Sequence, residues 1–222
     1  MTDYSTLLSH VDHTLLAPTA TWPEIRQLCD EGVQYGCASV CIPPSFVKQA
    51  AEYLTGRLPV CTVIGFPNGY NTTQQKCWEA SEAAENGAAE LDMVVNLGWV
   101  KEHRWDLVMQ EIRMVREICS DCVLKVIVET CLLTEQELWA LCEIVSNSGA
   151  DYIKTSTGFS TGGASRKDVA MIRTHSAPSL KIKAAGGIAT IQDGLDFLAL
   201  GADRLGTSRL VKAVMALEAE QK

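Results

Sequence analysis

The sequence predicts one α/β domain, a (β/α)8 barrel that spans residues 1–222. Short apolar runs alternate with longer amphipathic runs eight times, and no shift in composition divides the chain. Several of the short runs, such as VCTVIGF and VLKVIVE, are nearly continuous in apolar residues, as expected of strands covered on both faces. An open doubly wound sheet would share this alternation. Its usual GxGxxG turn after the first strand is missing, so we favour the closed barrel.

The strands are expected where short runs are rich in β-branched and apolar residues. In chain order these runs are Val11–Leu15, Ser39–Ile42, Val60–Phe66, Glu90–Asn96, Val123–Glu129, Tyr152–Thr155, Ile182–Ala185 and Arg204–Gly206.

The helices are expected between these strands, where apolar residues recur with helical spacing. They are Thr21–Gln34, Pro44–Leu54, Thr73–Asn86, Trp105–Ile118, Thr134–Ser148, Arg166–His175, Ile191–Leu200 and Ser208–Glu220. The first begins with a threonine cap and an early proline, and the second follows a Pro-Pro pair. Thr134 and Glu137 form a capping box, and Gly87, Gly149 and Gly201 follow helix ends.

The composition is that of an ordinary globular protein, with 47% hydrophobic and 21% charged residues. A net charge of -8 without any Lys/Arg-rich run argues against nucleic-acid or acidic-membrane partners. The N-terminal segment MTDYSTLLSHVDHTLL lacks the basic and apolar regions of a signal peptide, and no apolar run could span a membrane. We therefore expect a cytoplasmic protein, whose nine cysteines are reduced.

Two short motifs could suggest a metal site, but each stands alone. Cys119 and Cys122 form a CxxC in a helix-to-strand connection, and His10 and His13 form an HxxH. Since a structural zinc site needs four ligands, and neither motif has further ligands at a suitable spacing, we expect no metal.

Lys154 is the first candidate for chemistry, because it lies in the expected sixth strand. A single lysine in a strand commonly faces solvent, but a barrel strand has the interior on one face and helices on the other. A buried ammonium is costly, and burial therefore favours the neutral amine, which is a nucleophile for carbonyl carbon.

Lys183 and Asp92 would lie close to Lys154. Lys183 falls in the seventh strand, near its functional end, whereas Lys181 lies at the strand's entry. A second cation one strand away would further disfavour the charged form of Lys154. Asp92 interrupts the fourth strand; it could form a salt bridge at the strand end, but a carboxylate inside the barrel would pair with the lysines and serve as an acid or base.

Glycine-rich segments follow the last three strands. AGGI and LGTS follow the seventh and eighth strands, and STGF follows the sixth. Such turns are common for geometric reasons alone, but turns that lead into helices also present backbone N–H groups to a phosphate. The loops after strands seven and eight are the recurrent phosphate site of this fold.

Together these segments resemble the 2-deoxyribose-5-phosphate aldolase family. The matching segments run in order over nearly the whole chain: DHTLL, SVCIPP, ELDMVVN, LKVIVET, YIKTSTGFSTGGA, KAAGGI and LGTS. The resemblance implies a class I aldolase without metal or organic cofactor. Such an enzyme cleaves 2-deoxy-D-ribose 5-phosphate to acetaldehyde and D-glyceraldehyde 3-phosphate.

The resemblance also implies roles for individual residues. Lys154 would form the Schiff base, Lys183 would tune it, and Asp92 would transfer protons through a bound water. Asp12 and Thr14 match positions that support this relay. The phosphate would lie against Gly158, Gly186, Gly187, Gly206 and Ser208.

The sequence departs from the family pattern at four places. Ala189 stands where a basic residue is common, Ala17 where lysine is usual, and Arg209 where residues are generally small. The tail EAEQK lacks the terminal tyrosine that some members use. Because the cation at position 189 is missing, we expect Arg209 to contact the phosphate instead.

Other readings remain open at this point. The chain could be another Schiff-base sugar-phosphate aldolase or a transaldolase, which share the catalytic lysine. It could also be a non-catalytic sugar-phosphate-binding barrel, which predicts a disrupted lysine pair. A homodimer is a further expectation if some of the five tryptophans are exposed, although packing on the barrel would also use them.

Overall fold

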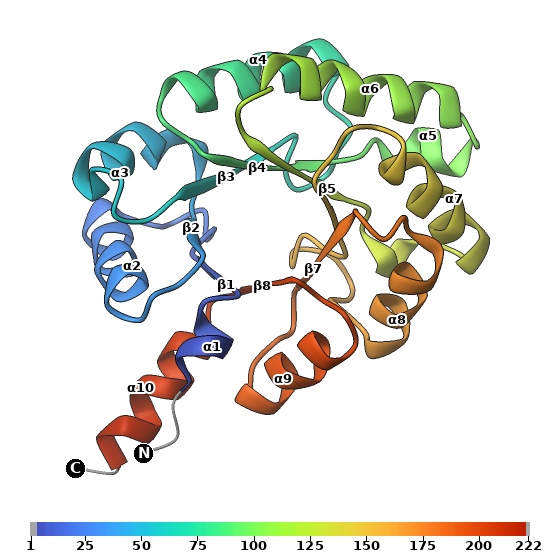
Figure 1. The fold of residues 1–222 in the computed structure, drawn as a ribbon. Coiled ribbons are helices and arrows are strands. Elements are labelled where there is room, and N and C mark those ends of the chain that lie inside the picture. Colours follow the sequence, from blue (N-terminus) through green and yellow to red (C-terminus); the bar gives the residue numbers. More distant parts are fainter. Residues whose placement is uncertain (1–3, 221–222) are drawn as a thin grey trace.

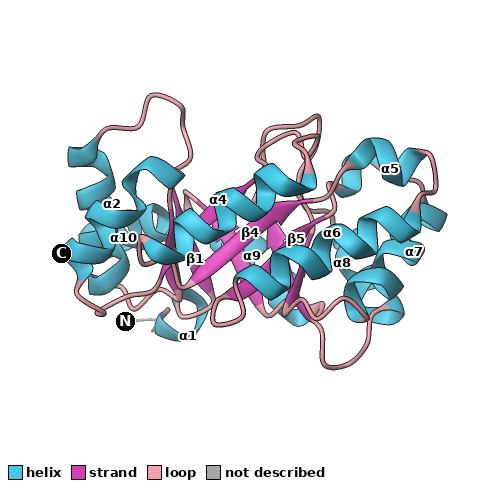
Figure 2. Cartoon of the chain, turned by 90° about the horizontal axis from the view of Figure 1, so that it is seen from above, coloured by secondary structure: helices cyan, strands magenta, loops and turns pink. Residues whose placement is uncertain are grey.

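The barrel is closed. The computed structural model describes residues 4–220, in which eight parallel strands pair in chain order and β1 pairs with β8. Figure 1 shows the helices arranged around this ring of strands, and Figure 2 shows them covering its outer face. The predicted (β/α)8 fold is confirmed, and the open sheet is excluded.

All eight expected strands and helices are present. The strands are β1 (Val11–Thr14), β2 (Ser39–Cys41), β3 (Val60–Ile64), β4 (Glu90–Val94), β5 (Val123–Ile127), β6 (Tyr152–Lys154), β7 (Lys181–Ala185) and β8 (Arg204–Thr207). The helices that follow them are α2 (Trp22–Gln34), α3 (Val47–Leu54), α4 (Thr73–Glu85), α6 (Trp105–Ile118), α7 (Glu135–Ser146), α8 (Arg166–His175), α9 (Ile191–Ala199) and α10 (Leu210–Glu220).

The differences from prediction lie at element ends and in short elements. The expected second helix begins as a 3-10 helix, η1 (Pro44–Phe46), which does not have the α-helical hydrogen-bond pattern. Sequence periodicity missed α1 (Ser5–Leu8), α5 (Leu97–Lys101) and the 3-10 helix η2 (Thr130–Leu132). These elements are too short to show a helical repeat of apolar residues.

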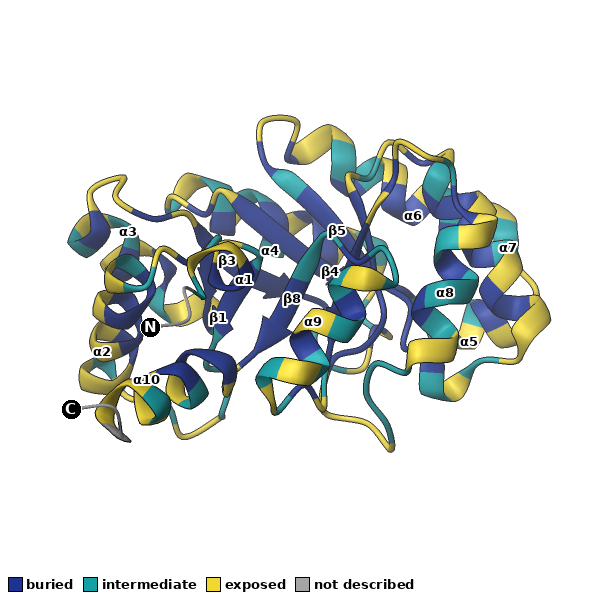
Figure 3. Cartoon of the chain, turned by 60° about the horizontal axis from the view of Figure 1, so that its bottom comes forward, coloured by how far each residue is buried: buried dark blue, intermediate teal, exposed yellow. Residues whose placement is uncertain are grey.

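The main apolar core lies between the strands and the helices, so the strands are buried while the helices expose their outer faces (Figure 3). In β4, Leu91 and Met93 belong to this core, whereas Glu90 and Asp92 alternate with them and face the barrel interior. The interior contains a small apolar cluster among the described residues: Cys41, Cys61 and Val63, with Leu16 and Phe66 against them. Val94, Ile127 and Ala185 also lie on the inner face, in the register of Asp92, Lys125 and Lys183, and these charged residues occupy the middle of the barrel.

The isolated cysteine and histidine motifs have structural contacts. All nine cysteines are free thiols, as expected. Cys119 and Cys122 each donate to a backbone carbonyl. His10 contacts the backbone just ahead of β8, whereas the His13 ring lies 2.8 Å from Glu31 of α2.

The structure also bears on the expectations for membrane and termini. No helix within residues 4–220 is long and apolar enough to cross a membrane. The end of the EAEQK tail, at residues 221–222, and residues 1–3 lie outside the described part of the chain.

Candidate active site

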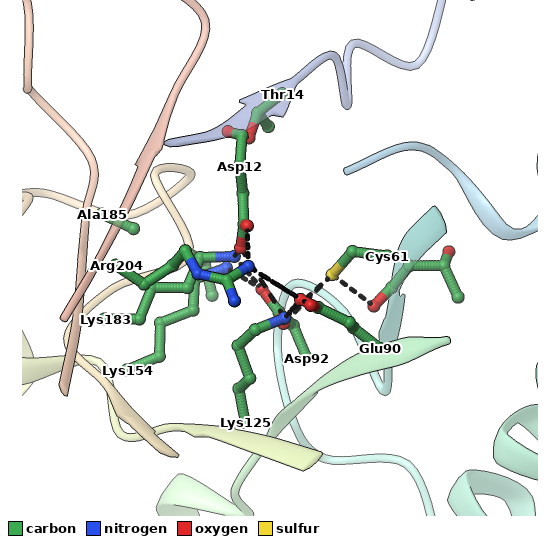
Figure 4. Close-up of polar contacts among 12 residues, drawn as sticks. Asp12, Thr14, Cys61, Glu90, Asp92, Lys125, Lys154, Lys183, Ala185 and Arg204 are labelled. Atoms are coloured by element: carbon green, nitrogen blue, oxygen red, sulfur yellow. Dashed lines mark hydrogen bonds and ion pairs between the residues drawn. The ribbon is translucent and has the colours of Figure 1, made fainter. Parts of the chain in front are cut away.

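Lys154, Asp92 and Lys183 meet inside the barrel, as the sequence predicted. Lys154 ends β6 and is directly opposite Lys183 in the register of β6 and β7. The Nζ atoms of Lys154 and Lys183 lie 2.8 and 2.6 Å from the same atom, Oδ2 of Asp92 (Figure 4). One carboxylate oxygen therefore connects the two amines.

The other oxygen of Asp92 is held by residues to which the sequence assigned no role. Lys125 of β5 places its Nζ 2.8 Å from Oδ1, and the Cys61 thiol lies 3.2 Å from the same atom. Burial alone would raise the pKa of Asp92, but Lys125, Lys154 and Lys183 hold it well below its usual value. Asp92 is thus a carboxylate in the resting site.

Asp12 and Arg204 extend the network toward the start of the strands. Lys183 and Arg204 both form ion pairs with Asp12, the latter at 2.5 Å, and Arg204 also lies 3.1 Å from Glu90. Burial would raise the pKa of Asp12 and lower that of Lys183, but their opposite charges reverse both shifts. Both groups are therefore charged, so Lys183 supplies the neighbouring cation that was expected beside Lys154.

This network bears on metal binding. Within residues 4–220, the groups with suitably close ligand atoms are Cys41, Cys61 and Asp92, and Asp12, Cys61 and Glu90. All three carboxylates in these groups already contact lysine or arginine. A divalent cation placed there would face several fixed positive charges, so the donor set does not suit a metal.

A cavity of about 430 Å³ opens beside Lys154 at the carboxyl ends of the strands. Besides Lys154, its lining includes Thr14 and every residue predicted to hold phosphate: Gly158, Gly186, Gly187, Gly206, Ser208 and Arg209. Ala189 is not among the lining residues. The Thr14 hydroxyl donates to the backbone carbonyl of Asp12 at 2.8 Å, so Thr14 connects the cavity wall to the relay through the main chain.

Glycine turns shape the wall of this cavity. Gly158 and Gly187 have φ values of 84° and 78°, in the left-handed region that glycine adopts without a steric penalty. Neither glycine N–H has an acceptor among the described residues. Gly186 packs directly against Gly163, and the Ala164 N–H donates to the Gly186 carbonyl at 3.1 Å, so the loops after β6 and β7 support each other.

Known proteins resemble this chain over nearly its whole length. The sequence profile of the DeoC/LacD family aldolases matches residues 6–208. A deoxyribose-phosphate aldolase of Streptococcus agalactiae is 55% identical over 215 residues, which are 97% of this chain and 96% of the relative. Another, from Streptococcus pyogenes, is 57% identical over 208 residues, or 94% and 93% of the two chains. The chain belongs to the DeoC/LacD family of aldolases.

Solved structures agree with this assignment. The deoxyribose phosphate aldolase of Aeropyrum pernix, described as a tetramer, has 31% sequence identity and a TM-score of 0.91. The similarity covers 98% of this aldolase and 93% of that chain. The lysine pair of this aldolase is intact, contrary to the prediction of a non-catalytic barrel.

The sequence missed three charged residues of this aldolase's interior, namely Lys125, Glu90 and Arg204. Lys125 carried a usable signal, because it is a lysine in a buried apolar strand, as Lys154 is. Glu90 and Arg204 begin their strands, where charged residues usually face solvent, and only closure of the barrel brings them together.

Proposed function

We propose that this aldolase reversibly cleaves 2-deoxy-D-ribose 5-phosphate to D-glyceraldehyde 3-phosphate and acetaldehyde through a Schiff base on Lys154. One observation carries the proposal: an amine in contact with a buried carboxylate opens into the same cavity as a set of glycine turns. The names of the Streptococcus relatives support the choice of substrate.

The chemistry begins with the amine of Lys154. It adds to the C1 aldehyde of the open-chain sugar, and loss of water gives the Schiff base. The protonated imine accepts electrons when the C2–C3 bond breaks and the C3 hydroxyl loses its proton. This step releases glyceraldehyde 3-phosphate, and the remaining enamine is protonated at C2 and hydrolysed to acetaldehyde.

Asp92 and Lys183 would move the protons that these steps require. Asp92 Oδ2 contacts both amines, so a proton can pass between Lys183 and the reacting carbon through this carboxylate or a water bound to it. Asp12 supports the relay by holding Lys183, and Thr14 keeps the adjoining backbone in place.

The phosphate would lie among the loops after β6, β7 and β8. The N–H groups of Gly158 and Gly187, which have no acceptor among the described residues, would donate to it, together with groups at Gly186, Gly206 and Ser208. Because Ala189 does not line the cavity and Arg209 does, Arg209 would supply the side-chain cation. No cofactor or metal is needed for this reaction.

We further propose a cytoplasmic enzyme that acts on small molecules, without nucleic-acid or membrane partners, and that forms a homodimer. Two tryptophans support self-association, because Trp78 is 72% exposed and Trp139 is 42% exposed. Sedimentation of the wild type and a Trp78→Ser variant would test this part: a monomeric wild type would refute it.

Borohydride reduction in the presence of acetaldehyde tests the mechanism. We expect one reduced adduct, mapped by peptide mass spectrometry to Lys154. The adduct should be lost in Lys154→Met and kept in Lys181→Met, which changes an exposed lysine at the other end of a neighbouring strand. An adduct on another residue, or none at all, would overturn the Schiff-base assignment.

The phosphate contact has its own test. Arg209→Ala should raise the KM for 2-deoxyribose 5-phosphate by about tenfold, because a charge-assisted hydrogen bond is lost. An unchanged KM would exclude Arg209 as the phosphate ligand. Faster turnover of a ketose phosphate by the wild type would instead favour a transaldolase.

A further inference from the structure

Glu129 has an unusual backbone conformation next to the active site. It follows β5 with φ 54° and ψ 65°, a left-handed conformation that is uncommon for residues other than glycine. On either side of it, the Val128 N–H donates to the carbonyl of Lys154 at 3.0 Å, and the Thr130 N–H donates to that of Thr155 at 2.9 Å. The strained residue is therefore tied to the strand that carries Lys154. Strained residues of this kind concentrate at functional sites.

The side chain of Glu129 is equally unusual, because it is buried without a cation. The residue is 2% exposed, and none of the ion pairs among residues 4–220 includes it. Among the described residues, its carboxylate accepts hydrogen bonds only from Thr157, apart from a weak one from the Cys131 thiol at 4.0 Å. A buried carboxylate costs free energy unless its hydrogen bonds are satisfied, so this contact stabilises both residues.

The contact with Thr157 determines the turn after β6. The N–H of Thr157 donates to Glu129 Oε1 at 3.2 Å, and its hydroxyl makes a short hydrogen bond to Oε2. The same hydroxyl oxygen accepts the Phe159 N–H at 3.1 Å. The N–H groups of Thr157 and Phe159 thus donate to acceptors of the protein itself. The N–H of Gly158, which lies between them, has no acceptor among the described residues. Residues 157–159 all line the cavity.

We propose that Glu129 is a positioning residue that presents the turn at residues 157–159 to the phosphate of the substrate. The carboxylate would not touch the substrate. It would fix Thr157, which in turn fixes the geometry around Gly158, while the backbone bonds beside Glu129 keep this turn in register with Lys154. This inference rests on the proposed function, because it assigns the turn to the substrate's phosphate.

Glu129→Gly is the variant that isolates the carboxylate. Glycine adopts the left-handed conformation without strain, so the variant removes the side chain while relieving the backbone. We expect the KM for 2-deoxyribose 5-phosphate to rise about tenfold, the value for loss of a charged hydrogen bond, while kcat stays within a factor of about two. The kcat/KM for unphosphorylated 2-deoxyribose should stay unchanged, which a general loss of structure would not produce.

A second variant probes the other side of the same contact. Thr157→Val removes the hydroxyl that bonds to Glu129. It should likewise raise the KM for the phosphorylated sugar and leave the kcat/KM for the unphosphorylated sugar unchanged. Since both changes break one contact, the double variant should be no worse than the poorer single variant. Equal losses with both sugars, or fully additive losses in the double variant, would overturn the proposal.

Titration calorimetry with inorganic phosphate separates this proposal from the proposed function, since it requires no turnover. The Kd for phosphate should be about tenfold weaker in Glu129→Gly than in the wild type. An unchanged Kd, or a wild type that binds no phosphate, would refute the role of Glu129. A wild type that binds phosphate but cleaves no sugar would refute only the proposed reaction.

Discussion

A buried ion pair outside the barrel holds the strand that carries Asp92. Lys76 of α4 and Glu111 of α6 lie 2.8 Å apart, and neither side chain has any exposed surface. Lys76 also donates to the carbonyl of Val94 at 2.8 Å, and Glu111 accepts the Asn96 N–H at 3.3 Å. The pair therefore connects two helices to the end of β4, just beyond Asp92.

Lys76→Met should destabilise the protein substantially. Burial lowers the pKa of Lys76 and raises that of Glu111, which shows that each charge depends on its partner to offset lost hydration. Removing one partner of a buried pair typically costs about 3–5 kcal/mol. For a chain of this size, that corresponds to a fall in Tm of about 6–20 °C. Replacing both partners by apolar residues leaves no unpaired charge, so Lys76→Met with Glu111→Leu should cost less than Lys76→Met alone.

Urea unfolding followed by tryptophan fluorescence would measure these differences at pH 7. The control is Lys167→Met, which removes a lysine from the exposed pair that Lys167 forms with Glu135 and should leave the midpoint nearly unchanged. The single variants Lys76→Met and Glu111→Leu are measured as well. If the double variant lost as much stability as these two losses added together, Lys76 and Glu111 would not be coupled. The reasoning from buried charge would then be refuted.

Two further predictions concern the active site. Nearby cations hold the pKa values of Asp12 and Asp92 below their usual range despite burial. These two carboxylates therefore stabilise the fold above the unfolded pKa of about 3.9, and this stabilisation is lost as the pH falls below that value. Urea midpoints should therefore drop below about pH 4, and less steeply in Asp12→Asn; a flat profile would contradict this. Gly186→Ala should raise the KM for the phosphorylated sugar more than Gly187→Ala does. Both glycines have positive φ, but a Cβ at Gly186 would lie 3.0 Å from Gly163, whereas one at Gly187 meets nothing within 4 Å; equal effects would contradict this account.

The fold was predictable because each of its signals is local. Apolar runs, caps and terminal glycines depend on neighbouring residues, and they located all eight strand–helix units. The short helices, such as α5 (Leu97–Lys101), were not predictable in this way. The start of α5 depends on a single capping contact, in which the Asn96 side chain accepts the Trp99 N–H.

The candidate site was predictable only in part, for a related reason. Lys154 and Lys183 can be recognised in the sequence as charged residues within apolar strands, and the glycine turns as short glycine-rich segments after the strands. Glu129 looked like the end of an expected strand, and only its backbone conformation and its contact with Thr157 distinguish it. Interactions between residues far apart in the chain become visible once the barrel brings them together.

The closed barrel also indicates why Lys154, and not another lysine, would be the nucleophile. The buried network contains three carboxylates, on Asp12, Glu90 and Asp92, and four basic groups, on Lys125, Lys154, Lys183 and Arg204. Lys125, Lys183 and Arg204 each form ion pairs with at least two of the carboxylates, whereas Lys154 contacts Asp92 alone. Of these four basic groups, Lys154 alone lines the cavity. Its amine can therefore react with a carbonyl at the cost of a single ion pair, whereas each of the other three groups would give up at least two.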